Sequence, residues 1–403
     1  MKVKISGEQE IFSAVVTGDV CPGGLNGKST TRNFAGVMQK VKDFICSGDL
    51  RLVQWETPVA DKLAPIIKSG PNLNSEEASI EIVTAAGFNI AMLANNHTGD
   101  HGPAVVLETI EKLQKWGLKT VGAGKDLETA RTPLIENVKG KTVAVFNFAE
   151  NEFGGAKADK AGSAPQDPLR DVAEVRAAAG KYDYVIVTLH GGHELNPFPS
   201  PRMVQYCRSF ADAGAKLVFN CHTHCPEGYE IWNGTPIIYN PGNFYFPKEG
   251  RFDGLWRYGY MVRCGFGETG AVALELVPYY FTNEQVLPLD ADGNARFEAY
   301  MKKLCAPLND PAALQRYLET WSTVHGKAYY ESINCSLPPG TNWLPQINER
   351  VILSRAMPIR NIFTCEAHND MIKCWFRLVE EQRVEEAAAR YGEIEELQKG
   401  FMI

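Results

Sequence analysis

Residues 86–102 read AGFNIAMLANNHTGDHG, and this stretch indicates the fold class of the chain. It begins where a helical pattern over 75–86 stops at a glycine, and its apolar run 89–94 predicts a buried strand. Pro103 then opens a further helical pattern. Between the strand and that helix stand the polar residues Asn95, Asn96 and His97. Helix, strand, polar loop and helix in this order predict an α/β unit with a polar site at the carboxyl end of its strand.

The same alternation extends in both directions along the chain. We expect Asn74 to cap the helix over 75–86, and Ser200 and Pro201 to open another helix. Short runs that are apolar on both faces predict strands buried in the middle of the structure. These runs are 12–17, 50–55, 89–94, 142–148, 183–189, 216–221 and 236–240. The alternation predicts an α/β fold with mostly parallel strands.

The pattern changes after about residue 255. Segments 258–266 and 271–279 predict an antiparallel pair, and beyond 285 the chain is mostly helical, with a polar loop at 336–346. The end, 372–399, predicts one amphipathic surface helix. Since a single core stops growing at roughly 250–300 residues, we expect two parts. They are a domain over 1–285 and a mostly helical extension over 286–403.

Composition narrows the class of protein. The formal net charge is −7 and no run of Lys or Arg stands out, which argues against a nucleic-acid partner. No segment approaches the roughly 20 apolar residues of a membrane-spanning helix. The first residues show no signal-peptide pattern, so we expect a cytoplasmic protein whose ten cysteines are reduced.

Residues suited to metal binding follow several predicted strands. Six of the eight histidines fall in three short segments, ANNHTGDHG, LHGGHE and CHTH, each directly after a strand. Asp19 and Glu56 follow two further strands. Imidazole, carboxylate and amide oxygen together suit Zn, Mn or Fe better than Mg or Ca. The sequence therefore predicts a site for one or two divalent metal ions.

These motifs resemble those of the bacterial capsule-synthesis family of the poly-γ-glutamate (CapA) type, which is similar to the calcineurin-like metallophosphoesterases. The resemblance covers about residues 10–280 in order, and the last 120 residues add nothing to it. It is carried by TGDV, WETP, residues 86–102, VGAG, LHGGHE, CHTH and YNPGNFYF. It implies a four-layer α/β/β/α sandwich with a two-metal site between the strand ends.

The resemblance also implies a role for each motif residue. The implied metal ligands are Asp19, Glu56, Asn96, His190, His222 and His224, and Glu56 occupies the bridging position. His97 matches a catalytic acid that is not a ligand. The phosphoesterases have D-x-H in the first motif, whereas this chain has Asp19-Val20-Cys21. Cys21 is either a thiolate ligand, which favours Zn or Fe, or a small turn residue beside a weak first site.

Several other polar residues near the motifs are given alternative roles. His193 and Glu194 are expected to support the ligands or face the substrate, and Asp100 to orient His97 or hold its turn. Asn243 either lines the cleft or caps a turn. The remaining histidines are expected to be structural, and these are His101, His325 and His368.

Two functions fit these expectations. The first is a hydrolase in which metal-activated water attacks a phosphate ester or a γ-glutamyl amide. The second is a non-catalytic accessory protein of capsule synthesis that binds a polyanion and keeps a vestigial metal site. The departure at Cys21 favours the second, and the missing signal-peptide pattern favours the first.

Overall fold

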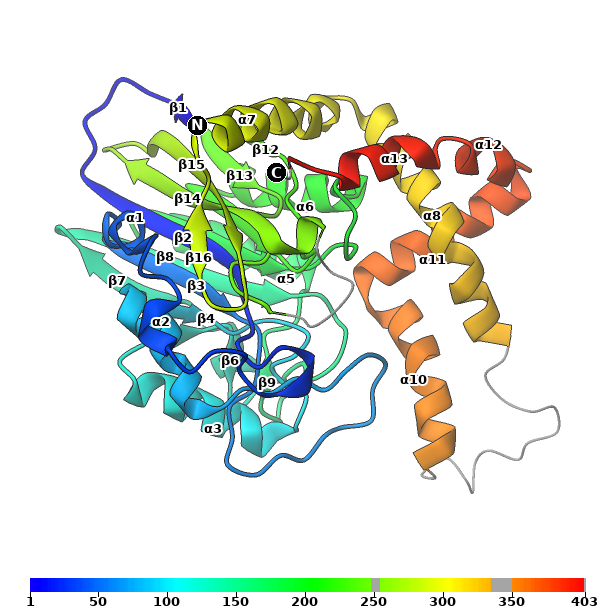
Figure 1. Cartoon of the computed structure of the whole chain (residues 1–403), viewed down its shortest axis with the longest axis horizontal. Coiled ribbons are helices and arrows are strands. Elements are labelled where there is room, and N and C mark those ends of the chain that lie inside the picture. Colours follow the sequence, from blue (N-terminus) through cyan, green and yellow to red (C-terminus); the bar gives the residue numbers. More distant parts are fainter. Residues whose placement is uncertain (248–253, 335–349, 402–403) are drawn as a thin grey trace.

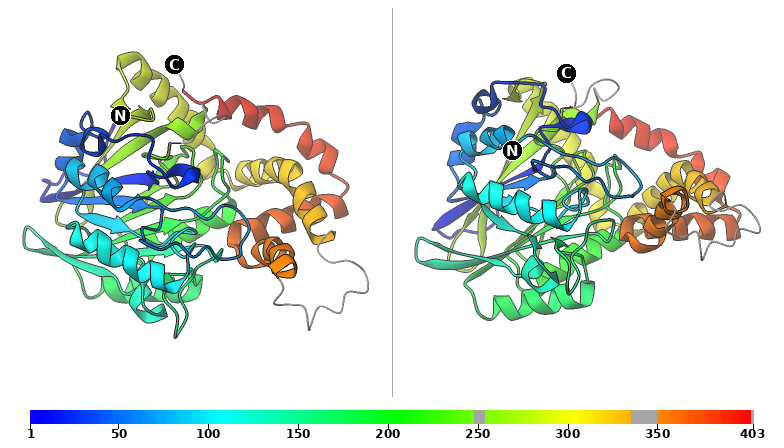
Figure 2. Two further views of the ribbon diagram at one scale, coloured as in Figure 1. Left: turned by 60° about the horizontal axis from the view of Figure 1, so that its bottom comes forward. Right: turned by 90° about the horizontal axis from the view of Figure 1, so that it is seen from below.

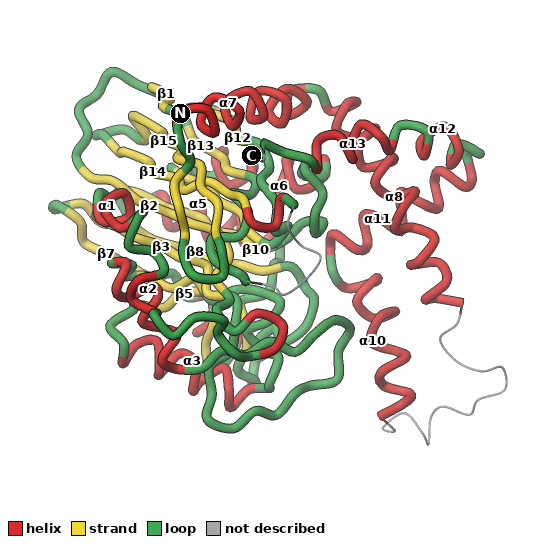
Figure 3. The backbone as a smooth tube through the Cα atoms, in the orientation of Figure 1, coloured by secondary structure: helices red, strands yellow, loops and turns green. Residues whose placement is uncertain are grey.

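The computed structural model describes residues 1–247, 254–334 and 350–401. Two large sheets form its centre (Figures 1 and 3). The first has the order β1-β15-β14-β2-β3-β4-β5, with β16 beside β15. Its strands are β1 (Lys2–Lys4), β2 (Phe12–Val20), β3 (Leu50–Trp55), β4 (Ile90–Met92), β5 (Lys119–Val121), β14 (Tyr258–Phe266), β15 (Ala271–Phe281) and β16 (Val286–Pro288).

The second sheet has the order β12-β13-β11-β10-β8-β7. Its strands are β7 (Leu134–Val138), β8 (Lys141–Ala149), β10 (Tyr184–His190), β11 (Leu217–Cys221), β12 (Tyr229–Trp232) and β13 (Thr235–Ile238). In both sheets the strands that carry the motifs are parallel, and antiparallel strands flank them. A short pair, β6 (Ala123–Gly124) and β9 (Gly162–Ser163), lies apart from both sheets.

Side chains of alternating direction pack the two sheets together and cover their outer faces. Phe12 of β2 and Tyr184 of β10 meet edge to face with ring centroids 4.8 Å apart, so the sheets are in direct contact. On the other face of the first sheet, Val53 and Ala91 belong to a core cluster with residues of α2 (Glu81–Ala86) and α3 (Pro103–Lys115). Helices α5 (Pro168–Ala179) and α6 (Pro201–Asp212) cover the second sheet. The expected four-layer α/β/β/α sandwich is confirmed.

The seven predicted strands and the antiparallel pair are confirmed, and so are the helices opened by Pro103 and Ser200. Ser200 Oγ accepts a hydrogen bond from the backbone N–H of Met203 at 3.2 Å, as a capping residue does. The helix predicted over 75–86 is wrong at its start. A 3₁₀ turn over Glu77–Ile80 precedes α2, and the Asn74 side chain donates to the carbonyl of Gly27 instead of capping a helix.

After β16 the described chain is helical. The helices are α7 (Ala291–Cys305), α8 (Pro311–Asn334), α10 (Arg350–Thr364), α11 (Glu366–Glu380), α12 (Val384–Ala388) and α13 (Tyr391–Gln398). The single helix predicted over 372–399 is wrong, because the chain turns at Gln382, whose φ is +57°, and so divides the segment among three helices. The loop predicted at 336–346 lies outside the described residues. The division into two domains at residue 285 stays a prediction.

The helices from α8 onward gather at one side of the sandwich, as the two turned views show (Figure 2). Polar contacts join them to it: Arg202 of α6 pairs with Asp370 of α11 at 2.5 Å and also with Glu150, which follows β8. Within residues 1–247, 254–334 and 350–401, no helix combines the length and apolar character that crossing a membrane requires. The cytoplasmic location stays a prediction.

Candidate metal centre

The candidate site lies where the carboxyl ends of strands from both sheets meet. Asp19 is the second-last residue of β2, Glu56 directly follows β3, and His190 ends β10. A bulge in β2 at Gly18 sets the direction of Asp19. Only glycine fits there, because a Cβ on Gly18 would lie 1.9 Å from the carbonyl oxygen of Gly242.

Backbone strain marks the loop after β11. His222 and His224 both have positive φ, +104° and +57°. Such conformations cost about 1–3 kcal/mol each in residues other than glycine. This geometry brings both imidazole rings to the carboxyl ends of the neighbouring strands. Backbone strain of this kind concentrates at functional sites.

Five of the predicted ligands form two groups that share one residue. In each group, ligand atoms of all members lie within 4.8 Å of one another. The first group is Asp19, Glu56 and His224, and the second is Glu56, His190 and His222. Between the members, His190 Nε2 lies 3.5 Å from Glu56 Oε1, and His224 Nδ1 lies 3.7 Å from Asp19 Oδ2. The arrangement has two adjacent centres with Glu56 between them.

The sixth predicted ligand, Asn96, adjoins the second group. Its Oδ1 lies 3.1 Å from His190 Nε2. The loop that presents it is held by Asn95, whose Oδ1 accepts hydrogen bonds from the backbone N–H groups of His97 and Thr98 at 3.0 and 2.8 Å. The structure therefore brings all six residues together.

Electrostatics in this cluster favour a bound cation. Asp19 is completely buried, and burial raises its pKa to about 7 although the backbone N–H of His222 opposes the shift. Burial and the neighbouring His222 lower the pKa of His190, which leaves its imidazole neutral, the form that binds metal. Asp19 Oδ1 and His190 Nδ1 lie 3.6 Å apart, and neither makes a hydrogen bond among the described residues. Buried acceptors without donors are what a divalent cation would satisfy, so the residues fit such an ion.

His97 stands beside the cluster but belongs to neither ligand group. Its Nδ1 lies 2.7 Å from Asp100 Oδ2, and because a carboxylate only accepts, Nδ1 carries the proton of this bond. Lys68 Nζ bonds the other oxygen of Asp100, and the backbone N–H of Leu73 donates to Oδ2. Burial and the charge of Lys68 lower the pKa of His97. The carboxylate of Asp100 thus contacts the His97 ring and joins its loop to Lys68 and Leu73, and its role stays a prediction.

Three further motif residues, His193, Glu194 and Asn243, differ in their contacts. His193 is buried and its Nε2 donates to the carbonyl of Ala367 in α11 at 2.8 Å; burial lowers its pKa to about 4. Glu194 is exposed and lines a cavity above the centre. Asn243 Oδ1 lies 2.8 Å from His224 Nδ1, so this amide fixes the orientation of the ring. Neither His193 nor Glu194 belongs to a ligand group.

Cys21 also lies outside the ligand groups of the described residues. Its thiol is buried and points to the carbonyl of Gly24, with Sγ and O 3.8 Å apart. Burial, together with the charge of Glu56, raises the pKa of this thiol far above its ordinary value. The geometry matches the turn-residue interpretation of Cys21.

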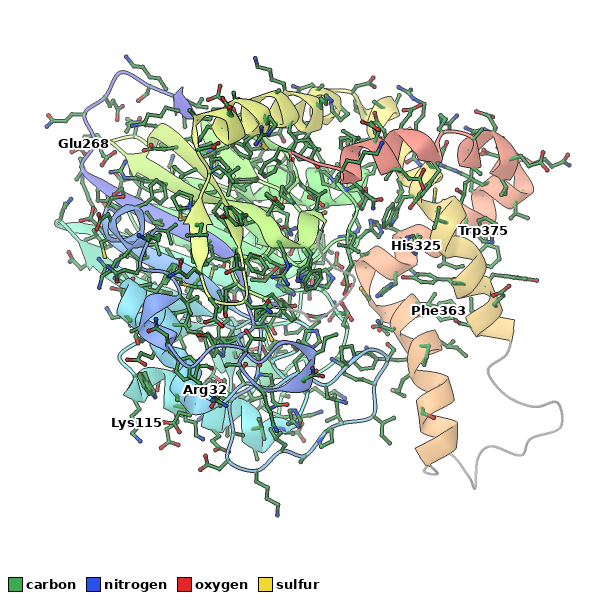
Figure 4. All side chains as sticks on the ribbon, viewed as in Figure 1. Arg32, Lys115, Glu268, His325, Phe363 and Trp375 are labelled. Carbon is green, nitrogen blue, oxygen red and sulfur yellow. The ribbon has the colours of Figure 1, made fainter. Side chains whose placement is uncertain are left out.

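A cavity of about 410 Å³ opens above the centre, and the C-terminal helices form one wall of it. Asn96, His97 and His222 line it from the sandwich. From α8, α10 and α11 come Trp321, His325, Tyr329, Pro358, Asn361, Ile362, His368 and Met371. Figure 4 marks His325 on α8 at the side of the helices nearest the sheets. His101, in contrast, donates from Nε2 to the backbone carbonyl of Leu73 at 3.0 Å and does not line the cavity.

Most of the lining residues were not predicted as site residues, and three of these carry side chains that can bind a metal. His325 and His368 were expected to be structural, yet both line the cavity, as does Glu152. For Glu152 a signal existed, because it closely follows the strand predicted over 142–148. His325 and His368 carry no such signal, since their positions depend on how the helices pack against the sandwich.

Comparison with known proteins identifies the family to which this chain belongs. Residues 13–248 match the family described as "Bacterial capsule synthesis protein PGA_cap". The match covers more than half of the chain, and the chain belongs to this family. The resemblance noted in the sequence is thereby confirmed, while α8, α10 and α11 lie beyond the matched residues.

Named relatives come from three organisms. The "PGA biosynthesis protein CapA" of Bacillus subtilis is 30% identical over 244 residues, 59% of this chain and 64% of that protein. The "Capsule biosynthesis protein CapA" of Bacillus anthracis is 30% identical over 216 residues, 51% of each. A "Probable polyglutamine synthesis accessory protein" of Mycobacterium tuberculosis is 30% identical over 185 residues, 43% of this chain and 49% of that protein. The chain thus matches about half to two thirds of the length of these relatives.

Solved structures from Thermus thermophilus are also similar. A hypothetical protein superposes with a TM-score of 0.44 and 16% identity, covering 67% of this chain and 100% of that one. A 5'-nucleotidase precursor superposes with a TM-score of 0.43 and 12% identity, covering 75% and 59%.

Proposed function

We propose that this chain is a metal-dependent hydrolase of capsule (poly-γ-glutamate) synthesis that acts on a phosphate ester or a γ-glutamyl amide. One observation carries the proposal: Asp19, Glu56, His190, His222 and His224, from four strand ends in two sheets, form two ligand groups joined at Glu56. Side chains so distant in sequence converge on a buried point that offers two charges and three imidazoles. A purely structural role would not require this set.

Asn96 completes the donor set, and its mixture of imidazole, carboxylate and amide oxygen suits Zn, Mn or Fe. Bound divalent ions would lower the pKa of a water to about 7 and polarise the electrophile. The chain's own residues then supply position and protons. His97 holds its Nδ1 proton against Asp100, so Nε2 is the nitrogen that exchanges a proton with the leaving group. His193 joins the loop after β10 to α11, and exposed Glu194 faces the substrate.

The cavity limits the substrate to a small molecule or the end of a chain. At about 410 Å³ it lies at the lower end of the volumes that hold drug-sized ligands, roughly 300–1,000 Å³. Its walls combine aromatic rings with histidines and Lys68. A polyanion would therefore enter by one terminus or one substituent.

A second candidate function is a non-catalytic accessory protein that binds a polyanion. The observation that favours it is Cys21, a protonated buried thiol where the first motif of the phosphoesterases has a histidine ligand. The first ligand group then holds Asp19, Glu56 and His224 only. A relative is itself named as an accessory protein of polyglutamine synthesis.

The two functions are separated by measuring metal content and turnover together. The purified chain is analysed for Zn, Mn and Fe, reloaded with each, and assayed on a panel of phosphate esters and γ-glutamyl peptides. Bound metal with turnover that Glu56→Gln abolishes supports the hydrolase. Metal-free protein without turnover, or turnover unchanged in Glu56→Gln, contradicts it.

Glu227→Gln is the matched control for Glu56→Gln. Both glutamates are fully buried, but Glu227 belongs to no ligand group of the described residues and does not line the cavity. Burial raises the pKa of Glu227 well above its ordinary value, so its carboxyl is protonated and glutamine replaces it without loss of charge. Glu227→Gln should retain metal and activity.

A further inference from the structure

A third group of potential ligands lies outside the centre described above. It consists of Glu152, Cys365 and His368, whose ligand atoms all lie within 4.8 Å of one another. Glu152 comes from the loop after β8, and the other two come from the start of α11. The proposed hydrolysis uses none of the three.

The local structure of α11 places two of these side chains together. Cys365 is the N-cap residue of the helix, and His368 follows three positions later, so both point to the same side of the first turn. A thiolate, an imidazole and a carboxylate are three ligands that zinc takes in catalytic sites, where water occupies the fourth position. Burial and the charge of Glu150 raise the pKa of the Cys365 thiol well above its ordinary value, so this thiol would lose its proton only to a bound metal. The charges of Glu152 and the resulting thiolate would then balance those of a divalent ion.

Three acidic residues lie near Cys365, and the hydrogen bonds that they already accept favour Glu152 over Glu150 and Glu366 as the ligand. Glu150 accepts hydrogen bonds from the backbone N–H of Ala367, from Arg202 and from the thiol of Cys365, whose Sγ lies 3.4 Å from Oε2, so its oxygens are already engaged. Glu366 accepts from the backbone and side chain of Asn151. Glu152 has a single hydrogen-bonding partner among the described side chains, Asn361, whose Nδ2 donates to Oε2 at 3.3 Å. Its Oε1 lies on the side of the His222 imidazole.

His368 is oriented in the way that metal-bound histidines usually are. The hydroxyl of Tyr329 contacts His368 Nδ1 and so fixes the ring with one nitrogen engaged. Tyr329, His368 and Glu152 all line the cavity above the metal centre. Glu152 Oε1 also lies 3.6 Å from His222 Nε2, so the third group adjoins the second ligand group.

We propose that Glu152, Cys365 and His368 form a separate binding site for a zinc-like divalent cation. The ion joins α11 to the loop after β8 and so fastens the helical wall of the cavity to the sandwich. The site is independent of the proposed hydrolysis, because it needs neither Asp19 nor Glu56. It also differs chemically from the main centre, since it alone contains a thiolate.

Cobalt substitution tests this difference. The full chain is stripped of metal by a chelator and reloaded with Co²⁺, and its near-ultraviolet absorption is recorded. A thiolate bound to Co²⁺ gives an intense charge-transfer band, whereas oxygen and imidazole ligands do not. We expect the band in the wild type, its loss in Cys365→Ser, and about one equivalent less cobalt per chain in that variant.

Cys21→Ser is the matched control, because Cys21 occupies the position where the first motif of the phosphoesterases has a histidine ligand. It should retain the band. His368→Ala serves as a second variant that leaves the thiol in place, and it should weaken the band and lower cobalt affinity. Circular dichroism shows whether each variant is folded.

The outcomes separate this proposal from the proposed function. A wild type that binds Co²⁺ without a charge-transfer band overturns the third site, whatever its hydrolytic activity. So does a band that disappears in Cys21→Ser and persists in Cys365→Ser, which would instead make Cys21 a ligand of the main centre. A band lost only in Cys365→Ser supports the third site even in a chain without turnover.

Discussion

Two adjacent residues, Asn96 and His97, should respond in opposite ways to replacement by alanine. Asn96 Oδ1 lies 3.1 Å from His190 Nε2, inside the reach of the second ligand group. Asn96→Ala removes a neutral oxygen donor from that group, so metal content and rate should fall together. His97 belongs to no ligand group, so His97→Ala should retain metal and lose only rate.

The size of the loss at His97 follows from its contacts. Its Nδ1 is held by Asp100 at 2.7 Å, which leaves Nε2 on the cavity side as the position for proton transfer. Positioned proton transfer contributes roughly 10²–10⁴ in rate. This corresponds to about 3–5 kcal/mol in the activation barrier. The loss should be smallest for esters with good leaving groups, which depart without a proton.

The assay is metal analysis of each purified variant beside kcat on a nitrophenyl ester and on an alkyl ester. His101→Ala is the control, because His101 lies in the same loop, is also buried and does not line the cavity. It should leave metal content and the ratio of the two rates unchanged. If His97→Ala empties the site, His97 is a ligand. If it alters neither metal nor rate on a substrate that the wild type turns over, its role in proton transfer is refuted.

Three further outcomes follow from the structure. Asn243→Ala should weaken metal affinity by about 10–100-fold in a titration, because it frees the ring of His224, and unchanged affinity would contradict the orienting role. Metal removal should lower the melting temperature, because an ion present at 100 times its Kd stabilises the folded state by about 2.7 kcal/mol. Equal melting temperatures with and without metal would argue against a bound ion. Phe219→Ala should cost about 3–5 kcal/mol in urea unfolding, because Phe219 is fully buried in β11. A loss below 1 kcal/mol, roughly that of a single buried methylene, would mean that the core around β11 repacks freely.

The sequence predicted the metal centre because a general rule links strand ends to sites. His190 and Glu56 lie far apart in the chain and belong to different sheets, but each stands at the carboxyl end of a parallel strand, and these ends meet where the two sheets adjoin. Their roles as ligands stay predictions. The start of α2 could not be predicted, since the Asn74 side chain is engaged by Gly27 in a loop that the local pattern does not describe. The helical wall was missed for a similar reason: nothing near His368 in the sequence shows that α11 packs against the loop after β8.

The cavity combines a part that the family shares with a part outside the family match. Its floor comes from strand-end motifs within residues 13–248, whereas Trp321, His325 and His368 come from helices beyond them. In the proposed hydrolase, catalysis would need only the strand-end residues of the floor. Substrate selection would depend on α8, α10 and α11, because these helices line the space above the candidate metal centre. Specificity is best examined by substitutions such as Trp321→Ala, which change the wall and leave every candidate ligand in place.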